Sequence, residues 1–297
     1  MNKVKKFFYS QNAAPYVFVL PFVLTVLLFW IFPIGNGVLL SFQDVLKDKW
    51  VGLKNYDRLL SDKIFLKAVW NSVKYMIGTC ALLIPFPLLF ASLLNSKLMK
   101  KPGFFKSIYF LPALTSVVVA GTIFRLIFGE MDTALANRVI EFFGHSPIKW
   151  LKGQWTGYFA LLLVACWRWT GVNILYFLAG LQSISTDLYE AASIDGASKW
   201  QQFKKISFPL VKPTTVYVLT ISIYAGLSMF LESYMLWKGN NSPQNIGLTI
   251  VGYLYRQGIE KRAMGYACAV GLVLLIVVMI VNLIQLTVTG TFKKEER

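Results

Sequence analysis

The stretch YEAASIDGASKWQQFKKISFPLVKP, residues 189–213, is a charged segment between two long apolar runs. The run before it covers about residues 157–181, and the run after it about residues 210–237. Each is long enough to cross the hydrocarbon core of a membrane, which takes roughly 20 mainly apolar residues as a helix. The segment is therefore interpreted as a loop that joins two membrane-spanning helices.

The chain as a whole is strongly apolar. Of its 297 residues, 56% are hydrophobic and 15% charged, and the mean hydropathy is +0.56, which is too high for one soluble core. The 30 Lys and Arg against 14 Asp and Glu fit basic residues at membrane edges, and no basic-aromatic module typical of nucleic-acid binding occurs. We predict an all-α, multi-pass protein of the cell (cytoplasmic) membrane, in contact with lipid and not with nucleic acid.

Six segments have the length and composition of membrane spans, and they place both chain termini on one side. With the termini in the cytoplasm, the inner segments carry 14 Lys and Arg and five acidic residues. The outer segments are longer in total and carry 13 Lys and Arg and eight acidic residues. The density of positive charge thus favours N-in and C-in. The prediction is one membrane domain, residues 1–297, with spans at about 16–42, 72–94, 107–128, 157–181, 210–237 and 265–289.

The loop after the fourth span is predicted to begin with a short helix. Asp187 and Glu190 have the spacing of a capping box, and Gly196 supplies the left-handed conformation with which helices often end. The helix exposes Ala191 and Ala192 beside Glu190, and small side chains next to a carboxylate suit docking against an arginine-bearing partner. The alternative, an amphipathic helix that only lies on lipid, stays open on the residues alone.

A second short helix should follow the glycine. The hydroxyl of Ser198 is placed to cap it, and Gln201 is placed to return the bond. We expect this helix to stop before Pro209, because proline lacks the amide hydrogen and its ring clashes with the preceding turn. Residues 182–209 are thus predicted to form two short helices that meet at a glycine corner.

The order of residues in this loop resembles the EAA loop of the permease subunits of binding-protein-dependent ABC importers. The match runs from Glu190-Ala191-Ala192 through Gly196 to Ile206 and Pro209, with Phe208 in place of the usual leucine. Further phrases resemble the carbohydrate-importer branch related to the maltose permeases: KWVGLKNYDRLL at 49–60, NSVKY at 71–75, FLPALTSVVVAGTIFRLIF at 110–128 and NIGLTIVGYLY at 245–255.

This resemblance implies the type I ABC importer permease fold and a non-catalytic subunit. Its partners would be a second homologous permease, two cytosolic ATPase subunits that bind ATP and Mg, and an extracytoplasmic sugar-binding protein, whereas this chain would bind no cofactor. No Walker A pattern, GxxxxGK[ST], occurs, and the three cysteines lie apart in apolar runs, so neither ATP hydrolysis nor a metal site is expected. The coupling residues implied for loop 182–209 are Glu190, Ala191, Ala192, Asp195 and Gly196.

Polar residues inside the spans are the candidates for handling substrate, because a charge in the bilayer is costly unless it pairs or faces water. Arg168 lies 13 residues before the end of the fourth span, about 20 Å above the cytoplasmic face. Tyr224, Ser228 and Glu232 follow at i, i+4 and i+8 and predict one polar stripe on the fifth span. Aromatic faces and hydroxyl groups suit a sugar. The predicted pathway residues are Arg168, Trp169, Tyr224, Ala225, Ser228 and Glu232.

Alternatives remain for these polar residues. Arg168 is equally placed to brace the two permeases or to form an ion pair with Glu232, and Asn282 and Gln285 of the sixth span are suited to bridge helices. On the outer side, YRQGIEKRAMGYA, residues 255–267, mixes charges and aromatic rings and is expected to help receive the binding protein.

The implied function is the import of a sugar or short oligosaccharide, with arabinose-type oligosaccharides favoured. The same architecture also carries other solutes, such as polyols, glycerol phosphate or peptides. A different class, the ion-coupled secondary transporter, would need a relay of buried carboxylates, and Glu232 is the only acidic residue in a predicted span.

Overall fold

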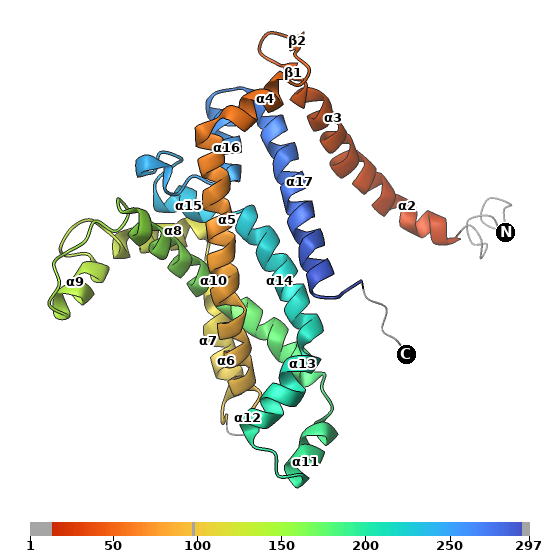
Figure 1. The fold of residues 1–297 in the computed structure, drawn as a ribbon, viewed down its shortest axis with the longest axis vertical. Coiled ribbons are helices and arrows are strands. Elements are labelled where there is room, and N and C mark those ends of the chain that lie inside the picture. The colour runs from red at the N-terminus through yellow and green to blue at the C-terminus, as the bar shows by residue number, and fades with distance from the viewer. Residues whose placement is uncertain (1–13, 97–98, 293–297) are drawn as a thin grey trace, which may run out of the picture. The chain divides into compact units, whose positions relative to one another are not determined.

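The computed structural model describes residues 14–96 and 99–292, and these are mostly helical (Figure 1). The elements, in chain order, are α2 (Ala14–Val26), η1 (Leu27–Ile31), α3 (Phe32–Ser41), β1 (Gln43–Asp44), β2 (Lys49–Trp50), α4 (Lys54–Ser61), α5 (Lys63–Leu83), α6 (Pro85–Leu94), α7 (Pro102–Leu114), α8 (Val117–Ile127), α9 (Leu135–Phe142), α10 (Gln154–Gln182), α11 (Thr186–Ile194), α12 (Lys199–Gln202), η2 (Phe203–Ser207), α13 (Phe208–Leu210), α14 (Lys212–Leu227), α15 (Leu231–Leu236), η3 (Pro243–Asn245), α16 (Ile250–Tyr255), η4 (Arg256–Glu260) and α17 (Met264–Val288). Residues 62–253 with 274–292 form one compact unit, and residues 14–61 with 254–273 form another.

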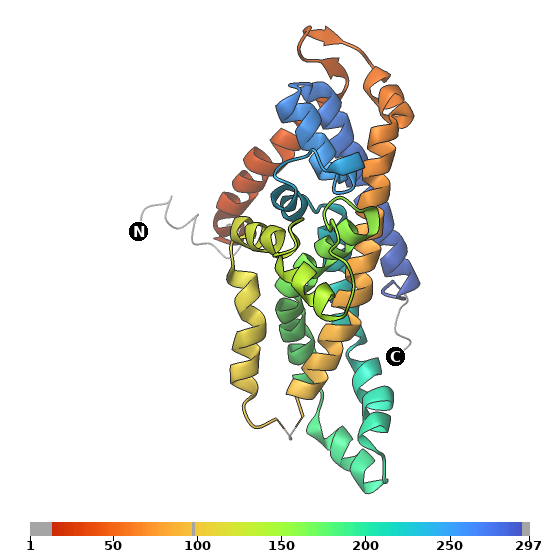
Figure 2. The same ribbon diagram turned by 90° about the vertical axis from the view of Figure 1, so that its left-hand side faces the viewer.

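Several of these helices are long and apolar enough to cross a membrane. Four helical stretches of the described chain have the length and apolar composition of a membrane span. The number rises to six if each of two sharply bent helix pairs counts as one span. One pair is α7 with α8, bent by 94°, which Figure 2 shows as the yellow helix and its nearly perpendicular continuation. The prediction of a single domain with six spans at the stated boundaries stays a prediction. The four stretches are Ala14–Ser41, Lys63–Leu94, Gln154–Gln182 and Met264–Val288.

The second bent pair shows that the helix after the glycine corner does not stop before Pro209, contrary to prediction. The turn ahead of the proline is a π turn, η2, in which the amide of Phe208 donates to the carbonyl of Phe203. This wider turn gives the proline ring room and uses a hydrogen bond that does not involve the missing amide. The helix then continues through α13 and bends by 63° into α14.

Helix α5 binds a segment that lies far along the chain. The side-chain amide of Asn71 donates to the carbonyls of Asn245, at 2.8 Å, and Leu248, at 3.0 Å. The hydroxyl of Ser72 accepts from the amide of Ile250 at 3.0 Å. Two of the family-like phrases, NSVKY and NIGLTIVGYLY, therefore meet in space. They meet because the buried loop before α16 has backbone groups that no helix satisfies.

The fifth predicted span is not one continuous helix. Helix α14 ends at Leu227, and α15 begins at Leu231 after a residue with non-helical angles, Phe230. The hydroxyl of Thr249 donates to the carbonyl of Met229 in this break at 2.6 Å. The hydroxyl of Thr249 thus replaces the backbone donor that this carbonyl would have in a continuous helix, and it stabilises the break. The predicted continuous stripe through Tyr224, Ser228 and Glu232 is wrong for this reason.

Glycines allow the helices of the larger unit to approach closely. A Cβ atom at Gly171 of α10 would overlap the backbone carbonyl of Tyr109 on α7. A Cβ atom at Gly226 of α14 would lie 2.7 Å from the Cα of Met76 on α5. Between helices in a membrane, such small residues let backbones pack without a separate hydrophobic driving force. Helix α10 is thereby held against α7, and α14 against α5.

In the smaller unit, an aromatic cluster supports the two-stranded hairpin β1–β2. The ring of Phe42 stacks on Trp50 at 5.7 Å and packs against Tyr56 at 5.5 Å between centroids. The guanidinium of Arg58 lies 4.3 Å from the ring centroid of Tyr266, a cation–π contact. These contacts tie α4 to the hairpin and to the start of α17.

The contact between α5 and the 245–250 segment should carry much of the stability of the larger unit. We expect Asn71→Leu to lower the melting temperature of the purified protein markedly, because two buried carbonyls lose their donor at a cost of about 1–3 kcal/mol each. Asn282→Leu is the matched control, because the amide of Asn282 donates only to Val278 of its own helix at 2.9 Å. Equal melting temperatures for the two variants would contradict this account.

Candidate functional site

The loop of residues 182–209, here called the coupling loop, begins with α11. The helix is capped by Ser185, whose hydroxyl accepts from the amide of Asp187 at 3.2 Å. The predicted capping box of Asp187 with Glu190 is therefore wrong. Ser185 has the extended backbone of an N-cap, with φ −57° and ψ 134°, and it takes this position ahead of Asp187, which lies in the first turn.

The corner of the coupling loop has the predicted geometry. Gly196 has a φ of +76°, and the amide of Ala197 donates back to the carbonyl of Ala192 at 2.9 Å, which closes α11 in the manner of a Schellman motif. The capping box of Ser198 and Gln201 is confirmed, with both reciprocal bonds present. Any side chain at Gly196 would meet the steric penalty of the left-handed region.

Two side chains brace the corner from inside. The amide of Gln202, only 5% exposed, donates to the hydroxyl of Ser193 at 2.8 Å and to the carbonyl of Ala197 at 3.3 Å. The hydroxyls of Tyr189 and Ser207 lie 2.9 Å apart, which links α11 to the π turn. We did not predict these roles from the sequence. The local sequence gives one indication of the role of Gln202: it lies one turn after the N-cap Ser198, where its side-chain amide needs a hydrogen-bond partner.

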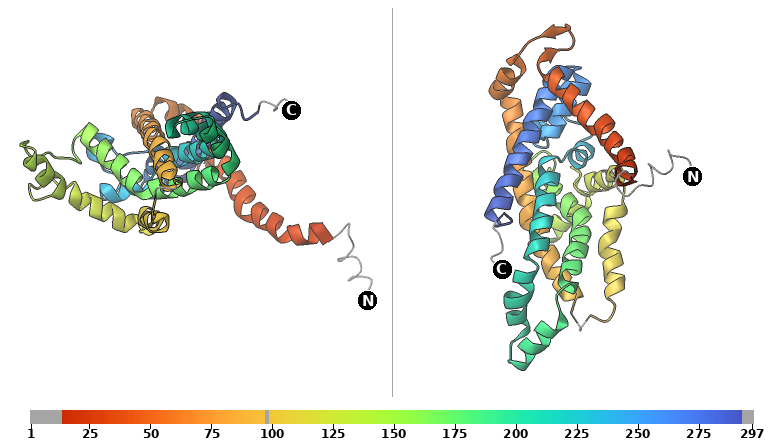
Figure 3. Two further views of the ribbon diagram at one scale, coloured as in Figure 1. Left: turned by 90° about the horizontal axis from the view of Figure 1, so that it is seen from below. Right: turned by 90° about the vertical axis from the view of Figure 1, so that its right-hand side faces the viewer.

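The side of the coupling loop that faces away from these braces is open. Four of the five predicted coupling residues are exposed, and Ala192 is half-buried. Two large apolar side chains beside them, which the prediction omitted, are strongly exposed: Ile194 at 87% and Trp200 at 68%. The right-hand view of Figure 3 shows the coupling loop, in green and teal, projecting past the ends of α10 and α14. The four exposed residues are Glu190, Ala191, Asp195 and Gly196.

Arg168 of α10 is the second candidate feature. Its Nε and Nη1 atoms are buried, and neither has a hydrogen-bond partner in the described part of the chain. Its guanidinium carbon lies 5.4 Å from the ring centroid of Trp169. Arg168 forms no ion pair with Glu232 within the described residues 14–96 and 99–292. Buried donors without acceptors are costly, so this site suits a ligand or partner that supplies oxygen atoms.

The other predicted pathway residues come from two elements. Tyr224, 59% exposed, and Ala225 lie near the end of α14, and Ser228 follows in the break, where its amide donates to Tyr224 at 3.0 Å. Glu232 lies on α15, half-buried. Tyr75 of α5 is buried close enough to interact electrostatically with both Glu232 and Arg168. The sequence does not by itself predict a role for Tyr75, although this residue ends the family-like phrase NSVKY.

The two polar residues of the sixth predicted span, Asn282 and Gln285, differ in their hydrogen-bond partners. The Oε1 atom of Gln285 accepts from the hydroxyl of Thr220 at 2.9 Å and so bridges α17 and α14. The amide of Asn282 donates within its own helix, to Val278. The predicted bridging role is therefore confirmed for Gln285 and wrong for Asn282. Among the described residues, no group of three or more His, Cys, Asp or Glu side chains is arranged to hold a metal ion.

Comparison with known proteins gives one consistent family. The family described as binding-protein-dependent transport system inner membrane component matches residues 7–290. The arabinooligosaccharides transport system permease protein AraP of Bacillus subtilis (strain 168) is 54% identical over 97% of this chain and 92% of its own length. The lactose transport system permease protein LacF of Rhizobium radiobacter is 30% identical over 94% of each chain.

A solved chain has the same fold at low identity. It belongs to a bacterial ABC transporter involved in the import of the acidic polysaccharide alginate, with a TM-score of 0.85, 22% identity, and coverage of 99% of this chain and 100% of that one. The predicted all-α, type I importer permease fold and the resemblance to carbohydrate ABC permeases are confirmed. This multi-pass protein of the cell membrane belongs to the family of inner membrane components of binding-protein-dependent transport systems.

Proposed function

We propose that this chain forms, with a second homologous permease, the translocation pathway of an ATP-driven importer for a sugar or short oligosaccharide. Arabinose-type oligosaccharides are the favoured substrate, because a relative that matches nearly the whole chain is named for them. The observation that carries the proposal is the coupling loop, whose corner is braced from inside and whose Glu190 face is open. Such a surface is built to receive another protein.

The partner on this side is a pair of cytosolic ATPases that bind ATP and Mg. Helix α11 would insert into a cleft of one ATPase, with Glu190 paired to an arginine there and the small Ala191 and Ala192 allowing close approach. Ile194 and Trp200 would add apolar contact at the rim. Because Gln202 fixes the corner, movement of the ATPases would move the loop as one body rather than deform it.

The loop is coupled to the spans through two direct connections. The bond between Tyr189 and Ser207 joins α11 to the π turn, and the same helix runs on into α14 after its 63° bend. A displacement of α11 would thus tilt α14, which carries Tyr224 near its other end. In this proposal the coupling loop lies in the cytoplasm, with N-in and C-in.

The pathway would use the polar residues of α10, α14 and α15. The unpartnered nitrogens of Arg168 would donate to sugar hydroxyls, and the exposed ring of Tyr224 would lie against an apolar sugar face. Trp169, Ala225, Ser228 and Glu232 complete this proposed set. An extracytoplasmic binding protein would deliver the sugar to the outer side, where residues 255–267 would help receive it.

Glu190→Gln tests the coupling role. In a complex of both permeases and the ATPases, we expect binding-protein-stimulated ATP hydrolysis to fall about tenfold or more, because a charge-assisted hydrogen bond contributes roughly 1.5–3 kcal/mol. Glu141→Gln is the control, since Glu141 is an exposed carboxylate of α9 at the opposite end of α10. Unchanged stimulation in the Glu190 variant would exclude this role.

Arg168→Gln separates a pathway role from a structural one. We expect sugar uptake to fall at least tenfold while the melting temperature of the complex stays the same or rises, because a buried guanidinium with unpartnered donors is replaced by a smaller neutral amide. Arg138→Gln, at an exposed position on α9, should change neither quantity. Loss of the second permease during purification of the Arg168 variant would show instead that this arginine braces the pair.

A further inference from the structure

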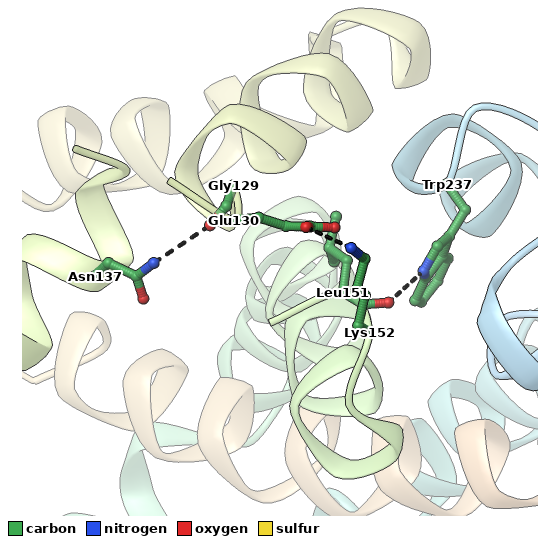
Figure 4. A network of polar contacts seen from close by, with 6 residues as sticks. All are labelled: Gly129, Glu130, Asn137, Leu151, Lys152 and Trp237. Atoms are coloured by element: carbon green, nitrogen blue, oxygen red, sulfur yellow. Dashed lines mark hydrogen bonds and ion pairs between the residues drawn. The ribbon is translucent and has the colours of Figure 1, made fainter. Parts of the chain in front are cut away.

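A cavity of about 280 Å³ lies in the larger unit, and its lining includes none of the proposed pathway residues and none of the coupling loop. Its lining comes from the end of α8 and the residues after it, the segment just before α10, the end of α15 and the loop that follows α15. Figure 4 shows Glu130, Lys152 and Trp237 from these segments. We call it the outer cavity. Its polar and aromatic lining comprises Arg125, Phe128, Glu130, Lys152, Trp237, Lys238 and Asn241.

The outer cavity lies on the side of the membrane opposite the coupling loop. Lys152 comes two residues before the first residue of α10, and the coupling loop follows the last residue of that helix. Helix α10 has 29 residues, which corresponds to about 43 Å at 1.5 Å per residue. With the coupling loop in the cytoplasm, the outer cavity therefore opens where solute arrives.

Hydrogen bonds hold the walls of the cavity in place. The indole N–H of Trp237 donates to the carbonyl of Leu151 at 2.9 Å, which fixes the plane of the ring. Arg125 donates through Nη1 to the carbonyl of Met235 at 3.3 Å. The Nζ of Lys152 lies 2.7 Å from Oε2 of Glu130, and both side chains are about half exposed, at 52% and 43%.

The loop before α10 is held from behind by a buried amide. Asn137 is fully buried, and its side chain donates to the carbonyls of Gly129, at 3.5 Å, and Met131, at 3.1 Å. Its oxygen accepts from the indole N–H of Trp150 at 2.9 Å. Figure 4 shows Asn137 reaching the residue next to Glu130. A prebuilt wall of this kind lowers the cost of ordering groups around a ligand.

The mixture of groups selects the class of ligand. Arg125, Lys152 and Lys238 donate hydrogen bonds, Asn241 donates and accepts, and the carboxylate of Glu130 accepts. An anion would have to lie beside this carboxylate, whereas a sugar hydroxyl can donate to it and accept from its neighbours. The apolar face of a sugar ring suits Trp237. A polyhydroxylated neutral ligand can pair with both the donors and the acceptor.

We propose that the outer cavity is a binding subsite for a glycosyl unit of a neutral oligosaccharide on the outer side of the membrane, lined by residues other than the proposed pathway set. The identity of the ligand class rests on the proposed sugar-import function. The site itself rests on the cavity, its fixed aromatic ring and its combined donors and acceptor. Such a subsite would hold one end of a chain before the chain enters the pathway.

Protection of an introduced cysteine tests this subsite without transport. The complex of both permeases and the ATPases, in nanodiscs and without binding protein or ATP, would carry Asn241→Cys with Cys80, Cys166 and Cys268 replaced by alanine. We expect arabinotriose to slow labelling of position 241 by a charged maleimide about fivefold, with half-maximal protection at about 1–10 mM for so open a site. Glu141→Cys, exposed on α9 and outside the cavity, should be labelled at the same rate with and without sugar.

Two further variants link protection to the cavity. Glu130→Gln should raise the arabinotriose concentration for half-maximal protection about tenfold, because a charged acceptor is lost. Lys238→Asn should also raise it, and asparagine tolerates the left-handed backbone at this position, where φ is +55°. A higher arabinotriose concentration for half-maximal protection in both variants would support the subsite, even if one of the substitutions disturbs the loop.

Three results would overturn the proposal. The first is no protection at position 241, or equal slowing at position 141. The second is stronger protection by trigalacturonate than by arabinotriose, which would make the cavity an anion site. The third is protection by the binding protein alone, which would make it a docking surface. Because the assay needs neither ATP nor uptake, its failure would leave the proposed import function standing, and loss of uptake would not remove the subsite.

Discussion

A chain that crosses hydrocarbon has to satisfy its backbone amides and carbonyls from within, because lipid offers them no partner. Most of this chain does so by forming helices. The segment between α14 and α16 does so only in part, and side chains supply some of the missing partners. Thr249 donates to the carbonyl in the α14–α15 break, and Asn71 and Ser72 of α5 bind the backbone just before and within α16.

This constraint also arranges the candidate pathway. Because α14 ends at Leu227, Glu232 lies on a separate short helix and not above Tyr224 on the same one. The polar residues therefore come from α10, α14, the break after α14, and α15, and the buried Tyr75 of α5 lies within electrostatic range of Arg168 and Glu232. Elements joined by a break can shift relative to each other without opening a continuous helix, a property that suits a pathway that must open and close.

In the proposed function the coupling loop meets the opposite requirement, since it has to present a rigid surface in water. Its polar groups are used internally: Gln202 and the Ser198–Gln201 box hold the corner, and Tyr189 ties α11 to the π turn. The outward face is left with Glu190, small alanines and exposed apolar side chains. The same bonds that stiffen the corner also join it to α14.

The sequence predicted what is encoded locally. The glycine stop at Gly196 and the Ser198 box depend only on neighbouring residues, and both occur. The N-cap of α11 was mistaken because Ser185 and Asp187 are both good capping residues, and a local pattern does not choose between them.

The remaining errors come from tertiary structure. The continuation past Pro209 depends on a π turn, and the break in the fifth span is held by a hydroxyl 20 residues further along the chain. The partner of Asn71 lies 174 residues away, so no local spacing indicates it. The pathway was therefore predicted as a list of residues, whereas its arrangement required the structure.

The central claim is that ATP hydrolysis, transmitted through the coupling loop, drives sugar import. The most direct test is uptake of labelled arabinotriose into proteoliposomes that contain both permeases and the ATPases, with binding protein outside and no ion gradient. The account predicts uptake only when ATP is enclosed and the ATPases are present. Uptake that persists without the ATPases, or that follows an imposed proton or sodium gradient, would contradict it and establish ion-coupled transport instead.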